Sequence, residues 1–362
     1  MSDLPPLPDH GWSREVISLK DAFVVPPAIS KPRTPSGVWK DGDIAHAANW
    51  RHESRMSLPL EGAPDEFDTL KGRYLFGGMF YGHFGHVITE TIARMWAWDD
   101  TYDGLLLTPK HANLLHIKKH YAEFFRSLGV EKLPMIIAQP TLVEELDVPG
   151  QAYGLGKIAA GTPEFRSFVK KSATSIEPSG AEKIFISRVN YIARGGLLGE
   201  RVLESNLTAA GYQPFYPEKH SWPDQLAAYK AAKKIVSLDT SALHMVGLVA
   251  EQDTDIAIIL RRNNDEFESI RTQINAFSGK MPVAINSLVS EYRENTKRSS
   301  TSSWGMLDFA DLRTHLAAHD FISASDSWVA PNDVQIDEDV TEARRRSPKQ
   351  LTLCQIEERY QP

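Results

Sequence analysis

Two apolar segments, Lys234-Ile-Val-Ser-Leu238 and Asp255-Ile-Ala-Ile-Ile-Leu260, decide the fold class of this chain. Each has the length and the β-branched composition of a buried strand. Residues 241–250 between them have the apolar content and the length of a short helix. A strand, a helix and a second strand in close succession form a right-handed βαβ unit, in which the two strands are parallel. These segments therefore predict an α/β fold with a parallel sheet.

The same alternation extends towards the N-terminus. We predict strands at 183–187 and 213–216 and helices at 200–210 and 223–232. The first half alternates less regularly, with strands at 73–78, 104–107, 133–138 and 141–148, and helices that begin at 84 and cover 112–128 and 163–175. Glu177-Pro-Ser-Gly180 is typical of a linker. We therefore predict two Rossmann-like lobes with parallel sheets, which join near residues 176–182.

The composition excludes several classes of protein. The chain has 362 residues, of which 42% are hydrophobic and 24% charged, so it is long enough for two globular domains and is not a disordered protein. A net charge of −7 gives no electrostatic reason to expect nucleic acid as a partner. The one cysteine, Cys354, excludes a disulfide framework and a cysteine-based zinc site within the chain. We therefore expect a reducing, cytoplasmic location.

The two ends of the chain carry fewer signals. Residues 1–10 have no basic start and no apolar run, so we expect no secretory signal. No segment approaches the roughly 18–20 apolar residues of a membrane span, which leaves at most peripheral membrane contact. Residues 1–65 are rich in proline and are expected to wrap over a domain. After residue 280 we expect a helix at 306–318 that crosses back to the first lobe, and a charged tail that orders against a partner chain, which would make the protein a homo-oligomer.

Three titratable side chains at helical spacing follow the predicted strand at 73–78. His86, Glu90 and Arg94 are each four residues apart, which places them on one face of a helix. An imidazole, a carboxylate and a guanidinium on one face are suited to acid–base chemistry or to holding an anion. The alternative is a polar cluster that fixes the helix to a neighbouring element.

A second group of polar residues follows two strands of the second lobe. Arg188 comes directly after strand 183–187, and Thr240 and Ser241 lie where strand 234–238 leads into a helix. Ligands of open α/β sheets bind beyond the carboxyl ends of the strands, and helix N-termini bind anions. These residues predict a phosphate site. The alternative is that Ser241 only caps its helix and that Arg188 forms a surface salt bridge.

The motifs and their order resemble glycosyltransferase family 61, which was long catalogued as a domain of unknown function and includes bacterial capsular polysaccharide enzymes. The segment Phe84-Gly-His-Val-Ile-Thr-Glu-Thr-Ile-Ala-Arg-Met95 resembles the family pattern Tyr-Gly-His-Trp-Leu-Val-Asp-Thr-Leu-Pro-Arg-Leu, with Glu90 in place of an Asp and Ala93 in place of a Pro. In the second lobe the resemblance rests on residues 183–188, Arg194, Gly199, Glu200, Glu218, Trp222, Asp224, Gln225, residues 231–236 and residues 240–244. It covers about residues 73–262.

The resemblance implies an inverting glycosyltransferase of GT-B-like fold, with two lobes that face a central cleft. A nucleotide-sugar donor would bind to the second lobe and a glycan or polysaccharide acceptor to the first. The leaving diphosphate would be stabilised without a metal ion or a cofactor by Arg188, Arg194, Thr240 and Ser241. Transfer of the hexose or pentose would need a general base, either Glu90 or His86, with the other orienting the acceptor. Which of the two takes the proton stays open.

On this basis we divide the chain into an acceptor-side lobe (1–178), a nucleotide-sugar-binding lobe (179–280) and an extension (281–362) that partly crosses back to the first lobe. The remaining candidate substrate-binding residues are His83, Arg94, Glu200, Glu218 and His244. Four of these have a structural alternative: Arg94 braces its helix by pairing with a carboxylate, the two glutamates cap or pair within the lobe, and His244 belongs to the core.

Three positions depart from the family pattern. Asp239 precedes the expected phosphate contacts, where a carboxylate is unhelpful unless it points away. Thr240 replaces a glycine, and Gly199 replaces an asparagine. These departures keep open a non-catalytic alternative, a nucleotide-sugar or polysaccharide binding subunit of an assembly complex.

Two metal-dependent alternatives are weaker. A GT-A enzyme needs an Asp-x-Asp motif at the carboxyl end of a strand, but Asp253-Thr-Asp255 precedes its strand and Asp337-Glu-Asp339 lies in the tail. A hydrolytic metal site at His83, His86 and Glu90 has no further ligands near it in the sequence.

Overall fold

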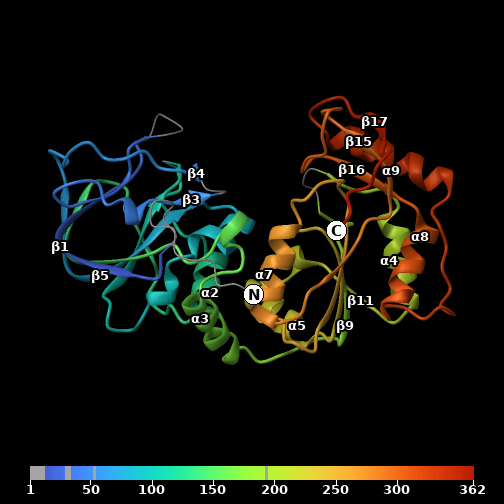
Figure 1. The fold of residues 1–362 in the computed structure, drawn as a ribbon, viewed down its shortest axis with the longest axis horizontal. Coiled ribbons are helices and arrows are strands. Elements are labelled where there is room, and N and C mark those ends of the chain that lie inside the picture. The colour runs from blue at the N-terminus through green and yellow to red at the C-terminus, as the bar shows by residue number, and fades with distance from the viewer. Residues whose placement is uncertain (1–12, 29–33, 52–53, 112, 192–194) are drawn as a thin grey trace. The chain divides into compact units, whose positions relative to one another are not determined.

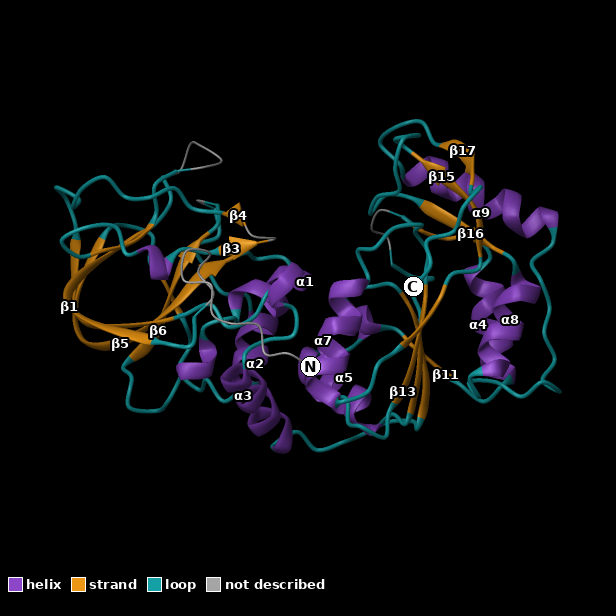
Figure 2. Ribbon diagram, in the orientation of Figure 1, coloured by secondary structure: helices purple, strands orange, loops and turns teal. Residues whose placement is uncertain are grey.

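The structure is a computed structural model that describes residues 13–28, 34–51, 54–111, 113–191 and 195–362. The chain forms two compact units. One comprises residues 1–177 with 247–249, and the other comprises residues 178–246 with 250–362. Each unit has its own sheets and helices, as Figures 1 and 2 show.

The first unit is built on a six-stranded mixed sheet in the order β2-β1-β8-β5-β6-β7. Its strands are β1 (Val16–Val25), β2 (Gly37–Trp39), β5 (Asp68–Phe80), β6 (Gly104–Pro109), β7 (Met135–Ile136) and β8 (Thr141–Pro149). β5 is parallel to β6 and β8, and β6 is parallel to β7, but β1 is antiparallel to both β2 and β8. The prediction of a wholly parallel first sheet is therefore wrong. Residues 16–25, expected to wrap over the domain, form a strand whose Ala22 and Val24 enter its core.

Two helices and several short elements complete the first unit. The helices are α2 (Lys119–Ser127) and α3 (Pro163–Thr174), and the short elements are β3 (Trp50–Arg51), β4 (Ser54–Arg55) and 3-10 turns at Ala45–Ala47 and Gly156–Ile158. α3 begins where Thr162 accepts a hydrogen bond from the amide of Phe165, with Pro163 in the first turn. The predicted helix at 163–175 is thus confirmed, and the one at 112–128 is shorter than predicted.

The predicted continuous helix after residue 84 is wrong. The segment forms α1 (Phe84–His86), a π-helical turn (Val87–Thr91) and, after a turn, a 3-10 turn (Met95–Ala97). The hydroxyl oxygen of Thr89 lies 2.9 Å from the carbonyl oxygen of Gly85, close enough to compete with regular helix hydrogen bonding. Because the helical repeat changes within the segment, the four-residue spacing no longer places His86, Glu90 and Arg94 on a common face.

The second unit contains a fully parallel five-stranded sheet in the order β11-β9-β12-β13-β14. Its strands are β9 (Lys183–Ile186), β11 (Gln213–Phe215), β12 (Lys234–Leu238), β13 (Asp255–Ile259) and β14 (Val283–Ile285). The helices between them are α4 (Glu200–Ala209), α5 (Trp222–Ala231), α6 (Ala242–Val249) and α7 (Glu268–Ser278), with a 3-10 turn at Pro217–Lys219. The βαβ unit predicted from residues 234–260 is confirmed.

The strand order fixes where a ligand would bind in this unit. The chain passes from β9 outwards to β11 and then returns to β12 on the other side of β9. This is the flavodoxin-like order 2-1-3-4-5, whose switch point lies between the first and third strands. In this unit the switch point is therefore the carboxyl edge between β9 and β12.

The C-terminal residues belong to the second unit. α8 (Phe309–Ala318) lies beside α4 on one face of the five-stranded sheet, and α5 and α7 cover the other face (Figure 2). Phe309, Leu312 and Leu316 of α8 pack in the same core as residues of the parallel sheet. The prediction that this helix crosses back to the first lobe is therefore wrong, since its apolar face is buried in the second unit.

The expected polar tail is also ordered within the chain. β10 (Gly196–Leu197), β15 (Leu288–Arg293), β16 (Trp304–Leu307) and β17 (Thr352–Gln355) form a second sheet in the order β10-β16-β15-β17. Helix α9 (Asp333–Arg346) begins with a capping box between Asn332 and Gln335. Its Val340 and Ala343 pack against Leu198 and Trp304. Burial within the chain therefore orders this segment.

Candidate functional site

Arg188 and Thr240 meet at the switch point of the second unit. Arg188 follows β9, Thr240 follows β12, and the Nη1 of Arg188 donates to the Oγ1 of Thr240 over 3.1 Å. The Arg188 guanidinium also lies 4.9 Å from the centre of the Tyr191 ring, a cation–π contact. The two strand ends that the sequence singled out are thus joined by a hydrogen bond, so an anion would lie beside this pair rather than between its members.

The same edge carries buried cationic groups that the sequence reasoning missed. Arg261 and Arg262 follow β13 and are both buried. The Nη1 of Arg261 and the Nε of Arg188 have no hydrogen-bond partner among the described residues. Burial lowers the pKa of Arg261 to about 9. Two arginines with unused donors beside the N-terminus of α6 can bind an anion such as a phosphate.

Asp239 is neutralised by these arginines. Its Oδ1 lies 2.9 Å from the Nε of Arg261, and its Oδ2 lies 2.9 Å from the Nε of Arg262. The side chain is fully buried. The departure from the family pattern therefore places a structural carboxylate at this position, which holds two arginines at the strand ends.

Glu200, the first residue of α4, lies beneath Arg188. Its Oε1 accepts a hydrogen bond of 2.5 Å from the backbone amide of Arg188. Burial raises the pKa of the Glu200 carboxyl to about 7, although the Arg188 amide and charge act in the opposite direction. The neighbouring Gly199 has φ +77°, and a Cβ there would lie 2.8 Å from Pro331 Cγ, so an asparagine would be strained at this position.

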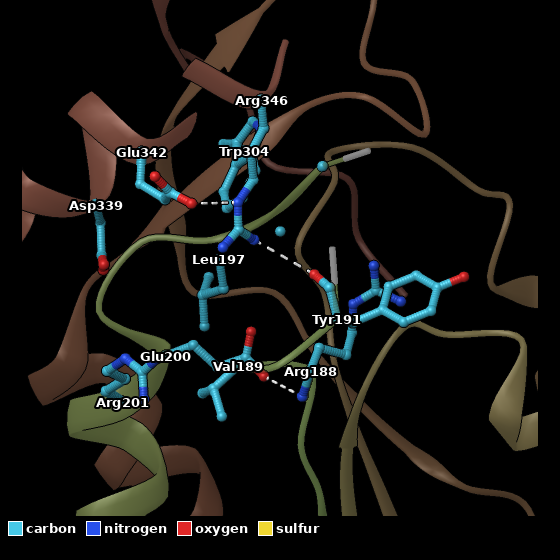
Figure 3. Close-up of a pocket in the computed structure, with 12 residues that line it drawn as sticks. Arg188, Val189, Tyr191, Leu197, Glu200, Arg201, Trp304, Asp339, Glu342 and Arg346 are labelled. Carbon is cyan, nitrogen blue, oxygen red and sulfur yellow. Dashed lines mark hydrogen bonds and ion pairs between the residues drawn. The ribbon is translucent and has the colours of Figure 1, made fainter. Parts of the chain in front are cut away.

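A cavity of about 90 Å³ opens beside Arg188. Figure 3 shows that its walls come from the loop after β9, from α4 and from the C-terminal segment. The residues that define its chemistry are Arg188, Tyr191, Glu200, Trp304, Glu342 and Arg346. Arg346 Nε donates to Glu342 over 2.6 Å, and its Nη1 donates to the Tyr191 carbonyl over 3.4 Å. The cavity thus combines cations, carboxylates and aromatic rings in one place.

The other candidate residues of the second unit are not gathered at this cavity. Glu218 is exposed on the 3-10 turn after β11, and Ser241 is exposed at the start of α6 without capping it. His244 is buried and its Nδ1 lies 2.6 Å from the Oε1 of Gln273, so it joins α6 to α7 in the core. Arg194 lies outside the described residues.

His86 and Glu90 form a hydrogen-bonded pair in the first unit. The Nδ1 of His86 lies 2.9 Å from the Oε2 of Glu90, which also accepts from the Thr89 hydroxyl over 2.5 Å. The Nε of Arg51 lies 3.2 Å from the Oε1 of Glu90. The side chain of His86 is 25% exposed and that of Glu90 only 2%. The imidazole is therefore the member of the pair that a ligand can reach.

The charge of Glu90 is held by its neighbours. Burial raises the pKa of the Glu90 carboxyl, but the hydrogen bonds from His86 and Thr89 and the charge of Arg51 outweigh it, so the net pKa is lowered. An ionised, buried carboxylate that accepts from an imidazole fixes the orientation of the ring. The arrangement resembles that of a general base with its orienting carboxylate.

Tyr81, His83 and Lys110 surround this pair. The rings of Tyr81 and His83 each have their centroid 5.4 Å from the centroid of the His86 ring. Lys110 follows β6 directly, and its Nζ lies 5.0 Å from the centre of the Tyr81 ring. Burial, then the charges of His86, Lys110 and Arg51, lower the pKa of His83. The group therefore lies at the carboxyl ends of the parallel strands β5 and β6.

Arg94 is a buried structural residue in this structure. It is 1% exposed and donates to the carbonyl of Pro149 and, over 2.7 Å, to the carbonyl of Ala48. Burial lowers its pKa to about 9. We expected it to pair with a carboxylate, but backbone carbonyls take that place. Gly78, with φ +89°, makes room for it, since a Cβ there would lie 3.2 Å from the Nε of Arg94.

The described part of the chain contains no group of three or more His, Cys, Asp or Glu side chains arranged to hold a metal ion. Among the helices of that part, none has the length and apolar content needed to span a bilayer.

The chain is thus a mixed α/β protein with buried arginines at the sheet edge of one unit and an imidazole–carboxylate pair in the other. A sequence model described as Glycosyltransferase 61 matches residues 84–257, from the start of α1 into β13. Residues 84–257 are therefore similar to the glycosyltransferase 61 family. No curated protein matches the chain significantly.

Proposed function

We propose that this protein is an inverting, metal-independent glycosyltransferase that moves a hexose or pentose from a nucleotide-sugar donor to a glycan acceptor. The observation that carries the proposal is the hydrogen bond between Arg188 and Thr240 at the switch point, within the family match. The second unit binds the donor and the first activates the acceptor. A capsular polysaccharide acceptor and a cytoplasmic location belong to the same proposal.

The leaving diphosphate binds at the carboxyl edge of the five-stranded sheet. Arg188 and Arg261 offer unused donors there, and the N-terminus of α6 adds a favourable dipole. These groups stabilise the negative charge that grows on the leaving oxygen as the bond to the sugar breaks. The cavity of about 90 Å³ beside Arg188 lies next to this edge.

His86 is the general base and Glu90 positions it. The acceptor hydroxyl displaces the Nη2 of Arg51, which lies 2.9 Å from the Nε2 of His86, and gives its proton to that nitrogen. The acceptor oxygen forms a bond to the anomeric carbon, and the nucleoside diphosphate leaves with the electron pair of the broken bond. Glu90 is a poorer base because it is almost fully buried and its pKa is lowered. Of the two residues, the imidazole is therefore the one that we propose as the base.

The proposal is tested by release of nucleoside diphosphate from a panel of nucleotide sugars with glycan acceptors. We expect the wild-type protein to release nucleotide and His86→Ala to abolish release while donor binding, measured by calorimetry, is retained. Retention of full activity by both His86→Ala and Glu90→Gln would show that the base lies elsewhere.

The second candidate is a non-catalytic binding subunit. Arg51 holds Glu90, and the His86 ring is also within 2.9–3.1 Å of the Arg51 Nη2, so the pair can serve as a binding surface alone. Thermal protection by nucleotides without turnover of any donor and acceptor in the panel would favour this second candidate.

A further inference from the structure

Lys110 is a half-buried cation without a counter-ion. Within the described part of the chain its ammonium group makes no ion pair. The group lies over the face of the Tyr81 ring in a cation–π contact. Burial and the charge of Arg51 lower the pKa of Lys110, and Glu90 compensates only in part. A cation–π contact contributes on the order of 1 kcal/mol and does not replace a carboxylate. In the free protein this position is therefore electrostatically unfavourable.

Glu90, the carboxylate close to Lys110 among the described residues, is already engaged. Glu90 accepts from His86 and Thr89 and pairs with Arg51. Arg51 and Lys110 together carry two positive charges against the single negative charge of Glu90. Among the described residues the cluster thus has an excess of positive charge, in a protein whose net charge is −7.

A buried hydroxyl beside the same cluster also lacks a partner. Tyr81 is 3% exposed, and its Oη has no hydrogen-bond partner among the described residues. Burial, and then the charge of Glu90, raise the pKa of Tyr81, while Arg51 acts in the opposite direction. The hydroxyl is therefore a neutral donor near Arg51 and Glu90. An unsatisfied buried donor costs roughly 1–3 kcal/mol, and a ligand that accepts from it recovers this energy.

We propose that the acceptor carries a negatively charged group, such as the carboxylate of a uronic acid or a phosphate, which binds to Lys110 and Arg51 beside His86. This inference rests on the proposed function and specifies the substrate class of its acceptor side. The anion supplies the missing counter-ion of Lys110 and accepts from the Tyr81 hydroxyl. A neutral sugar could accept from the Tyr81 hydroxyl but would leave Lys110 without a counter-ion, so the site discriminates against it.

The matched test compares acidic and neutral oligosaccharides with wild-type protein and three variants. Uronic-acid oligosaccharides and their neutral counterparts of equal length are titrated by calorimetry without donor, and then used as acceptors. Lys110→Gln removes the charge, and Lys110→Arg keeps it. Lys119→Gln, at a residue that is 91% exposed on α2, makes the same charge change away from the cluster.

We expect the wild-type protein to prefer the acidic series by tenfold or more in affinity and in kcat/KM. Lys110→Gln reduces this preference at least tenfold, Lys110→Arg retains most of it, and Lys119→Gln leaves it unchanged. Equal affinity for both series, or a preference that survives Lys110→Gln, contradicts the inference. The inference is also contradicted if Lys110→Gln loses affinity for nucleoside diphosphate but keeps the preference for acidic acceptors. The anion bound by Lys110 would then be the donor phosphate. Turnover of neutral acceptors alone overturns the inference and leaves the proposed function standing. Binding of acidic glycans without turnover of any donor overturns the proposed function and leaves the acidic-ligand inference standing.

Discussion

The Nδ1 of His86 lies 2.9 Å from the Oε2 of Glu90, and these two atoms belong to side chains of very different accessibility. Glu90 is enclosed by Thr89 and Arg51, whereas the His86 side chain is 25% exposed and its Nε2 lies 2.9 Å from the Nη2 of Arg51. This difference supports the proposal that the carboxylate orients the ring and that the ring meets the acceptor.

We expect His86→Ala to lower kcat by about 10²–10⁴-fold, the usual contribution of a general base. Added imidazole should restore part of the rate in this variant. Glu90→Gln keeps the shape of the side chain and should lower kcat less, with KM for the donor unchanged. Steady-state kinetics with each variant measure both effects. A greater loss in Glu90→Gln than in His86→Ala would reverse the two roles.

Arg188→Ala should weaken binding of a nucleoside diphosphate about 10–100-fold, which corresponds to the loss of charge-assisted hydrogen bonds worth roughly 1.5–3 kcal/mol. The free energy of unfolding should change little, since the side chain is only half buried. Calorimetric titration measures the affinity. Arg126→Ala, at an exposed arginine of α2 in the first unit, is the matched control and should bind nucleotide normally. Equal affinities for all three proteins would remove Arg188 from the donor site.

Asp239→Ala should lower the free energy of unfolding by about 3–5 kcal/mol, because it leaves Arg261 and Arg262 buried without their shared carboxylate. Urea denaturation measures the change. Asp253→Ala removes an exposed carboxylate that pairs with Lys233, and it should cost less than about 1 kcal/mol. Similar costs for the two substitutions would show that Asp239 does not neutralise the arginines in solution.

Glu200 should make stability depend on pH near neutrality. Its pKa in the folded protein is about 7, above the ordinary value of 4.5, so the folded state binds more protons than the unfolded state between these values. The stabilisation is present below pH 4.5 and is lost as pH rises through 7. Relative to that of the wild type, the free energy of unfolding of Glu200→Gln should therefore rise by about 3 kcal/mol between pH 5 and pH 8. Parallel pH dependence of unfolding in the two proteins would contradict a raised pKa.

The strongly apolar strands of the second unit were predictable from sequence because their signal is local. Residues 234–238 and 255–259 each form one strand, as their β-branched runs indicate. The switch point follows from the order of β11, β9 and β12 in the sheet. Arg261 and Arg262 could have been found as well, since they follow β13 at the same edge as Arg188 and Thr240. The capping box at Asn332 and Gln335 is a second local signal, which indicates the start of α9.

The remaining features depend on contacts between residues far apart in the sequence. The antiparallel pairing of β1 with β8 joins residues more than a hundred positions apart, which no local period encodes. The cavity wall formed by Trp304 and Arg346 depends on the packing of α9 against Leu198. The π-helical turn at Val87–Thr91 changed the face on which Arg94 lies, although the sequence has an ordinary helical spacing. Arg51 and Lys110 were missed because only the folded chain brings them to His86.

The most direct test of the account is nucleoside diphosphate release by the wild-type protein and by His86→Ala, with a donor panel and acidic glycan acceptors. The account predicts release by the wild type that requires acceptor, and release by His86→Ala reduced at least about a hundredfold with donor affinity unchanged. Equal release by the two proteins, or nucleotide binding without release by either, would contradict it.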